Sequence, residues 1–336
     1  MSNSANIYDK LQAIIGTDAG NRGMKPLIVQ GDLQLAAETL ASLTPGKHVV
    51  VLSGFPCCVD QTPPTETDGP PGTLAIARTA AVLGYSVTVV TEYCNHAVFA
   101  AALDGLAMPS DSDCSCSSSS SIIQLECFPS TFAQEDEDRF QHLCQRCDLS
   151  ISCERAGEAR DGNCYTMRGI NMNNKGLIGP LNRLVKESQC QLISIGDGGN
   201  ELGMGKVYDK IVHNPKIANG EQIGCVVPAD YLIAASVSNW GGYALAAAAA
   251  VARAQKQQQQ QQNNTKYSTK QWIDWCLPTT EEEVTLLRRC VAAGCRDGVS
   301  GQMEATVDGM PLETSMKCLE DLRLAAMTSD RSRDNE

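Results

Sequence analysis

The segment GDGGNELGMG at residues 196–205 carries the residue types best suited to chemistry. Asp197, Asn200 and Glu201 place two carboxylates and an amide among five glycines in ten residues. Glycine allows positive φ and lets backbone amides approach a small anion. The segment follows an apolar run at residues 190–195, which is typical of a buried strand. Because open α/β sheets bind ligands where such strands end, we expect a binding site here.

Two nucleotide-binding motifs do not fit this turn. The pattern G-x-G-x-x-G would need glycine or alanine where Glu201 stands, and an acid there would repel a pyrophosphate. The pattern G-x-x-x-x-G-K-[ST] would need glycine at Asn200 and a hydroxyl at Val207. These mismatches disfavour a nucleotide-dependent enzyme. A tight structural turn with solvated acids is the simpler alternative.

The elements that must position this turn alternate along the chain. Apolar runs predict strands at residues 48–53, 86–91, 122–127, 148–153, 190–195 and 229–237, with helices expected at 73–83, 95–103, 134–147 and 177–187. This alternation predicts an α/β fold, a Rossmann-like three-layer domain with a mostly parallel central sheet and ligand loops at the C-terminal strand ends. We expect residues 1–330 to form a single domain. It carries two low-complexity insertions, serine-rich at 110–121 and glutamine-rich at 255–264, and both are expected to be disordered.

The net charge and the composition limit the classes of molecule that the protein could bind. The formal net charge of −12 argues against a nucleic-acid partner or an anionic membrane surface. No apolar run is long enough to span a bilayer. We expect the partner to be a small-molecule substrate. The sequence gives no signal of the oligomeric state. Sixteen cysteines with irregular spacing favour an intracellular, reducing compartment. The pair Cys144 and Cys147 is a lone C-x-x-C, without the second pair that a structural zinc site needs.

Other polar loops are expected beside the central turn. The segment ETDGPPG at residues 66–72 presents Glu66 and Asp68 on a loop stiffened by prolines. After the strand at 148–153, Arg155 and Arg168 could clamp a carboxylate. Ser238 or Asn239 could cap a helix starting near residue 242, whose N-terminus would attract an anion. Each of these loops could instead be an ordinary solvated loop.

Taken together, these segments resemble the C-terminal domain of the D-glutamate cyclase family. The resemblance rests on ETDGPPG at 66–72, ERAG at 154–157, DG at 161–162, MRG at 167–169, GDGGNELGMG at 196–205, SNWGGY at 238–243 and RDG at 296–298. It implies a lyase that converts D-glutamate to 5-oxo-D-proline with loss of water. It also implies a mitochondrial location; a cytoplasmic one is the alternative, since no transit peptide is evident. The chain departs from the family in its two insertions and in lacking the additional N-terminal domain of the animal protein.

The reaction needs a base for the ammonium, an acid for the departing hydroxyl and donors for the tetrahedral oxyanion. We hypothesise that Asp197 and Glu201, with Asp68 nearby, share the acid and base roles. The substrate-binding candidates are Glu66, Arg155, Arg168, Gly198, Gly199, Asn200, Ser238, Asn239 and Asp297. Among them, Arg168 or Arg155 would hold the α-carboxylate, and the amides of Gly198 and Gly199 would meet the oxyanion.

No cofactor is certain from the sequence. A carboxylate cluster of this density could instead hold a divalent cation such as Mg²⁺ or Mn²⁺. The alternative to an enzyme is a non-catalytic protein that binds or senses an acidic amino acid with the same loops.

Overall fold

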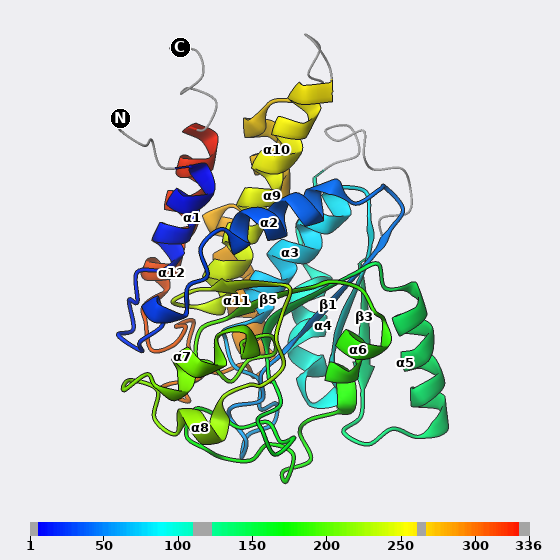
Figure 1. Cartoon of the computed structure of the whole chain (residues 1–336). Coiled ribbons are helices and arrows are strands. Elements are labelled where there is room, and N and C mark those ends of the chain that lie inside the picture. Colours follow the sequence, from blue (N-terminus) through cyan, green and yellow to red (C-terminus); the bar gives the residue numbers. More distant parts are fainter. Residues whose placement is uncertain (1–5, 110–122, 261–266, 329–336) are drawn as a thin grey trace.

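The computed structural model describes residues 6–109, 123–260 and 267–328 (Figure 1). The serine-rich segment at 110–121 therefore lies outside the described residues. In the described ranges, no helix is long and apolar enough to cross a membrane.

Six parallel strands form one sheet in the order β3-β2-β1-β4-β5-β6. The strands are β1 (His48–Gly54), β2 (Ser86–Glu92), β3 (Ile123–Phe128), β4 (Leu149–Arg155), β5 (Leu192–Gly196) and β6 (Tyr231–Ala234). This order is that of the Rossmann-type sheet, in which the direction of winding reverses between β1 and β4. The predicted fold class is confirmed, and the loops that leave β1, β4, β5 and β6 meet at one edge.

Alternate residues of the strands face two different helical layers. In β1, Val49 and Val51 pack into the larger core, whereas Val50 and Leu52 pack into the other. The larger core is covered by α1 (Ile7–Ile15), α2 (Asp32–Ser42), α3 (Pro70–Val82), α4 (His96–Asp104), α9 (Ser238–Gln260), α10 (Thr269–Cys276), α11 (Thr280–Ala292) and α12 (Leu312–Met327). The opposite face is covered by α5 (Gln134–Arg146) and α6 (Leu184–Glu187), so the sheet lies between two layers (Figure 1).

Two shorter helices, α7 (Tyr208–Val212) and α8 (Gly220–Ile223), cover the loops that follow β5. The helix expected at residues 177–187 is shorter than predicted, because only a 3-10 turn at Pro180–Arg183 and α6 form there.

The alanine-rich helix α9 packs on the sheet and crosses α3 closely. A Cβ on Gly242 would lie 2.6 Å from the backbone of Gly72, so glycine at both positions allows this approach. The helix starts at Ser238, four residues before the predicted start near 242. The crossing brings the loop before α3 against the N-terminus of α9, which matters for the site below.

The expectation of disorder in the glutamine-rich tract is wrong for residues 255–260, which continue α9. Glutamine has a favourable helix propensity, and here it extends a helix already nucleated by buried alanines. Tyr8 donates a hydrogen bond to Gln255 at 3.2 Å, and Trp272 donates one to Gln257 at 3.1 Å. Residues 261–264 of the tract lie outside the described ranges.

Candidate active site

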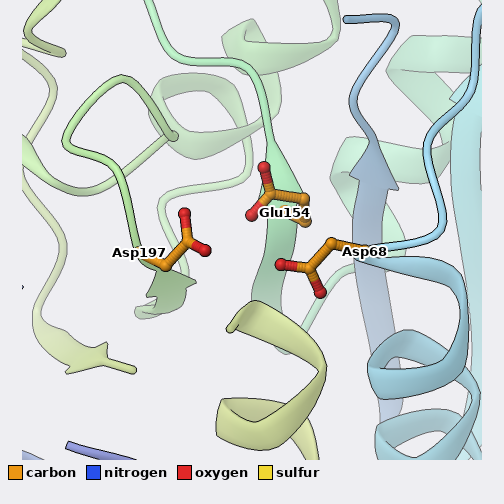
Figure 2. A group of neighbouring side chains, drawn as sticks. All are labelled: Asp68, Glu154 and Asp197. Atoms are coloured by element: carbon orange, nitrogen blue, oxygen red, sulfur yellow. The ribbon is translucent and has the colours of Figure 1, made fainter. Parts of the chain in front are cut away.

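Three carboxylates converge at the carboxyl edge of the sheet. Asp68 precedes α3, Glu154 is near the end of β4, and Asp197 follows β5. Figure 2 shows the three side chains directed toward one another, and one oxygen from each lies within 4.8 Å of the others. Their exposed fractions are 2%, 5% and 3%, respectively. Two of them, Asp68 and Asp197, were predicted as catalytic residues; the third was not.

The N-terminus of α9 fixes Asp68. Its carboxylate accepts hydrogen bonds from the backbone amides of Ser238 at 2.8 Å and Asn239 at 2.7 Å. The Asn239 side chain in turn accepts from the amides of Gly69 and Gly72. A carboxylate is favourable at a helix N-terminus because the free amides and the helix dipole are positive there. The anion expected at this helix end is therefore a residue of the chain itself.

Glu154 reaches the site because β4 contains a bulge. Ser53 pairs with Cys153 and Gly54 pairs with Arg155, so Glu154 is the extra residue, and its φ is +46°. Cys153 faces the larger core, so in a regular strand the next side chain would face the opposite layer. A bulge re-aims a side chain, and here it directs Glu154 toward Asp68 and Asp197. The sequence signal was an acid at the end of a buried strand, which the alternation rule alone assigns to the wrong face.

Arg22 connects Asp197 to the opposite wall of the site. Its guanidinium lies 2.9 Å from Asp197 and 2.6 Å from Asp308. Sequence reasoning missed Arg22 and Asp308, because they lie in the loop after α1 and in the segment before α12, far from the central turn along the chain. Only the packing of both ends against the sheet brings them together.

The three carboxyl groups favour the protonated state. Burial raises the pKa of Asp68 to about 8, with a further contribution from repulsion by Asp308. Burial, followed by repulsion from Glu201 and Asp68, raises the pKa of Glu154 well above its ordinary value. Burial also raises the pKa of Asp197 well above its ordinary value, although Arg22 opposes the shift. Each group is buried among other acids, which is the arrangement that allows carboxyl groups to exchange protons near neutral pH.

The donor set also suits a hard divalent cation. Oε2 of Glu154 and Oδ2 of Asp197 are buried without a hydrogen-bond partner among the described residues. Buried carboxylate oxygens without partners are rare, and Mg²⁺ and Mn²⁺ prefer such oxygen ligands. The residues present therefore fit a cation held by Asp68, Glu154 and Asp197.

A cavity of about 310 Å³ is lined by Glu154, whereas Asp68 and Asp197 are not among its lining residues. Its walls carry several charged or polar side chains: Arg22, Glu66, Glu154, Arg168, Asn200, Glu201 and Asp308. Arg168 is exposed at the rim and donates a hydrogen bond to the carbonyl of Val299 at 3.1 Å. The volume suits a small metabolite, and the wall carries two guanidiniums, those of Arg22 and Arg168, together with four acids.

Glu201 has a different position from the one its catalytic role would need. Its two carboxylate oxygens accept the backbone amides of Gly198 at 2.7 Å and Gly199 at 2.8 Å. The amides expected to meet an oxyanion therefore already bind a carboxylate. The structure instead makes Glu201 a wall residue that holds the glycine turn closed.

Arg155 lies outside the cavity. Its side chain is fully buried, with an ion pair to Glu92 at 2.6 Å and a hydrogen bond to Asn182 at 3.0 Å. The bulge that turns Glu154 toward the site sends Arg155 in another direction. Arg155 is therefore not placed to bind a substrate in the cavity. It has a structural role, because it joins the ends of β2 and β4.

Of the other residues predicted to bind substrate, some line the cavity and others lie behind its wall. Glu66 and Asn200 line the cavity, and Oδ1 of Asn200 and Oγ of Ser238 are buried without partners in the described part of the chain. Asp297 accepts the backbone amides of Val299, Ser300 and Gly309, so it orders the loop that carries Asp308. Asp297 thus supports the site from behind rather than from its wall.

The fold and this site define a Rossmann-like α/β protein with a buried carboxylate cluster at the carboxyl edge of its sheet. Residues 11–323 match the family model described as "D-glutamate cyclase-like, C-terminal", so the chain belongs to that family. It is 31% identical over 318 residues to the human protein named "D-glutamate cyclase, mitochondrial". That alignment covers 91% of this chain and 49% of the human protein, so the chain spans about half the length of this relative. The resemblance noted in the sequence is confirmed.

Proposed function

We propose that this chain is a lyase that cyclises D-glutamate to 5-oxo-D-proline and water. The observation that carries the proposal is the buried cluster of Asp68, Glu154 and Asp197, of which Glu154 lines a cavity of about 310 Å³. Membership of the D-glutamate cyclase-like family and the name of the human relative support the choice of substrate. Holding the substrate folded supplies much of the rate, because ring closure is intramolecular.

In this reaction the amine nitrogen attacks the γ-carboxyl carbon, a C–N bond forms, and a C–O bond breaks to release water. Asp197 and Glu154 are the residues best placed to move the protons, because each keeps one oxygen without a partner and the two side chains face each other. One would accept a proton from the substrate ammonium, and the other would give one to the departing hydroxyl. This pairing replaces Glu201, whose oxygens are already taken by backbone amides.

Binding of the substrate falls to the cationic and neutral donors of the wall. Arg168 at the rim would hold the α-carboxylate, since a guanidinium binds a carboxylate through two parallel hydrogen bonds. The hydroxyl of Ser238 is fully buried near Glu154 and is not among the residues that line the cavity; it is a candidate donor to the tetrahedral oxyanion beside the carboxylate cluster. Asn239, Asp68 and Asp297 would keep the surrounding loops in place.

The charge of the site favours a bound divalent cation. Six acids, Glu66, Asp68, Glu154, Asp197, Glu201 and Asp308, lie on or near the cavity wall, and a cation would replace the protons that burial favours on Asp68, Glu154 and Asp197. We propose that Asp68, Glu154 and Asp197 would hold Mg²⁺ or Mn²⁺. A cation bound there would polarise a substrate carboxyl group and stabilise negative charge on its oxygens.

The test is incubation of the purified chain with D-glutamate and, separately, with L-glutamate, followed by chromatographic detection of 5-oxoproline. Each reaction is run with added Mg²⁺ or Mn²⁺ and with a chelator. We expect product from the D isomer and its loss on chelation. Product that persists in chelator would assign the chemistry to the proton-exchanging carboxyl groups alone.

The second candidate is a non-catalytic protein that binds an acidic amino acid. It is favoured by the guanidinium of Arg168 on the cavity wall, which could hold a ligand carboxylate without any proton transfer. This reading predicts saturable calorimetric binding of D-glutamate without release of 5-oxoproline. The same preparation in both assays separates the two functions.

We further propose that residues 1–330 act as one domain, with a small molecule rather than nucleic acid or membrane as its partner, as the net charge of −12 suggests. The name of the human relative supports a mitochondrial location, with the cytoplasm as the alternative. Cell fractionation with an antibody to this chain distinguishes the two compartments.

A further inference from the structure

Two thiols lie close together at the edge of the sheet opposite the cavity. Sγ of Cys147 and Sγ of Cys190 are 3.2 Å apart, although 43 positions separate them in the sequence. Cys147 lies two residues before β4 and Cys190 lies two residues before β5, so both lie near the amino ends of neighbouring strands. The sequence pairs Cys147 with Cys144 in a C-x-x-C pattern, whereas the fold pairs it with Cys190.

The two sulfurs have different surroundings. Cys190 is half-buried, and Cys147 is buried beneath it. Hydrogen bonding from the Cys147 thiol, together with the Ser188 hydroxyl 3.1 Å away, outweighs burial and lowers the pKa of Cys190 to about 6. The hydrogen bond and burial raise the pKa of Cys147. The half-buried sulfur of Cys190 therefore favours the thiolate near neutral pH, and the buried thiol of Cys147 lies within its reach.

We propose that a hydroperoxide oxidises Cys190 and that Cys147 then forms a disulfide with it. This is the arrangement of a redox-sensitive cysteine beside a resolving cysteine. The site lies outside the acidic cavity, and the proposal is independent of the proposed function.

The chemistry needs a hydroperoxide as the only co-reactant. The Cys190 thiolate attacks the peroxide, an S–O bond forms, the O–O bond breaks, and the hydroxide that leaves takes a proton to become water. The thiol of Cys147 then loses its proton and attacks the sulfur of the Cys190 sulfenic acid. An S–S bond forms, the S–O bond breaks, and a second water leaves. Two thiols are oxidised by two electrons in all, and hydrogen peroxide is reduced to two waters.

The geometry favours this pair over the other close thiols in the described part of the chain. Cys57 and Cys58 are 3.8 Å apart, but they are adjacent residues. Neighbouring Cα atoms are about 3.8 Å apart, which is shorter than the usual Cα separation of a disulfide. Cys147 and Cys190 lie in the two segments that lead into β4 and β5. Their sulfurs need to approach by only about 1 Å to reach the length of a disulfide bond.

A bond between these residues would join the starts of β4 and β5 and close a loop of 43 residues. A cross-link of this span restricts the unfolded chain, so the oxidised protein should have a higher Tm. The carboxyl ends of the same strands carry the site, so turnover should be unaffected by the bond. The expected signature is a gain in thermal stability without a change in activity.

The test treats the full chain with hydrogen peroxide, blocks the remaining thiols by alkylation and digests it with trypsin without reductant. We expect a disulfide that links the peptides of residues 147–155 and 187–206, assigned by fragmentation to Cys147 rather than Cys153. Reduction with dithiothreitol should separate the peptides and return Tm to its starting value.

Three variants make the test specific. In Cys190→Ser the linked peptide should be absent and the rise in Tm lost, and in Cys147→Ser the Cys190 sulfenic acid should accumulate and be trapped by dimedone. Cys94→Ser is the matched control, because Cys94 is also half-buried but has a pKa raised to about 12 by burial. In the Cys94→Ser variant, the disulfide between Cys147 and Cys190 should form at the wild-type rate. If Cys190 stays fully alkylatable while other cysteines are oxidised, the proposal is wrong.

Discussion

Asp68 and Asn239 form reciprocal hydrogen bonds between the loop before α3 and the start of α9: the side chain of each residue accepts backbone amides from the other segment. The Asp68 carboxylate accepts the Asn239 backbone amide at 2.7 Å, and the Asn239 side chain accepts the amides of Gly69 and Gly72 at 2.9 and 2.8 Å. The Asn239 side chain also donates to the carbonyl of Thr67 at 3.0 Å. The loop after β1 and the start of α9 are thereby locked at one distance, which places Asp68 opposite Glu154.

This lock makes Asn239→Ala a strongly destabilising substitution. It leaves the buried amide of Gly72 without an acceptor and the amide of Gly69 with the Asp68 carboxylate as its remaining one, and an unpaired buried donor costs about 1–3 kcal/mol. We expect the free energy of unfolding to fall by about 2–4 kcal/mol in urea denaturation. Asn174→Ala, at an exposed position, should change it by less than about 0.5 kcal/mol. Equal effects of the two substitutions would refute the lock.

Glu283 should make stability fall as pH rises. It is buried on α11 and accepts the Tyr243 hydroxyl at 2.5 Å, and burial raises its pKa to about 7 from an ordinary 4.5. Between these two pH values the folded state keeps a proton that the unfolded state has released. Ionisation therefore removes about 3 kcal/mol of stability between pH 4.5 and 7, with little further change above.

Glu283→Gln keeps an acceptor for Tyr243 and removes the titration. Urea denaturation at pH 5 and pH 8 should show a smaller loss of stability in this variant than in wild type. Glu281→Gln, an exposed change on the same helix, should retain the wild-type pH dependence. A variant with an undiminished slope would show that Glu283 does not titrate in this range.

Divalent cations should stabilise the folded protein through the three site carboxylates. A ligand that binds only the folded state raises Tm in proportion to the logarithm of its concentration. We expect Mg²⁺ or Mn²⁺ to raise the Tm of wild type and of Asp209→Asn, an exposed control, but to have no effect on Asp197→Asn. Identical shifts in all three proteins would place cation binding elsewhere.

Arg168 should affect substrate binding more than the chemical step. Arg168→Gln removes the guanidinium at the rim of the cavity, so KM for D-glutamate should rise about tenfold or more with a smaller change in kcat. Arg160→Gln is the matched control, since Arg160 is also exposed and lies over the ring of Tyr208 at 5.5 Å. A fall in kcat at constant KM would assign Arg168 a role in the transition state instead.

The sheet was predictable because its strands are long apolar runs with clear ends. The prediction for residues 48–53 differs from β1 by one residue, and that for residues 86–91 differs from β2 by one residue. The place of the site followed from the same pattern, since loops after parallel strands meet at one edge. The same pattern predicted Asp68 and Asp197, which the structure brings together with Glu154 at that edge.

The rest of the site depends on contacts that no local pattern encodes. Arg155 was expected to bind substrate as a charged residue after the strand predicted at 148–153, but the bulge at Glu154 turns Glu154 toward the site and Arg155 away from it. Arg22 and Asp308 meet only after both ends of the chain have packed. The glutamine tract was misjudged because its composition was read without the helix that precedes it.

The central claim is that the buried carboxylates perform the cyclisation of D-glutamate. The most direct measurement compares 5-oxoproline formation by wild type, Glu154→Gln and Glu158→Gln at equal folded concentration. Glu158 follows four residues later and is not among the residues that line the cavity, so it is the matched control. We predict a fall of about 100-fold or more for Glu154→Gln and wild-type turnover for Glu158→Gln. Turnover by Glu154→Gln at the wild-type rate would contradict the account.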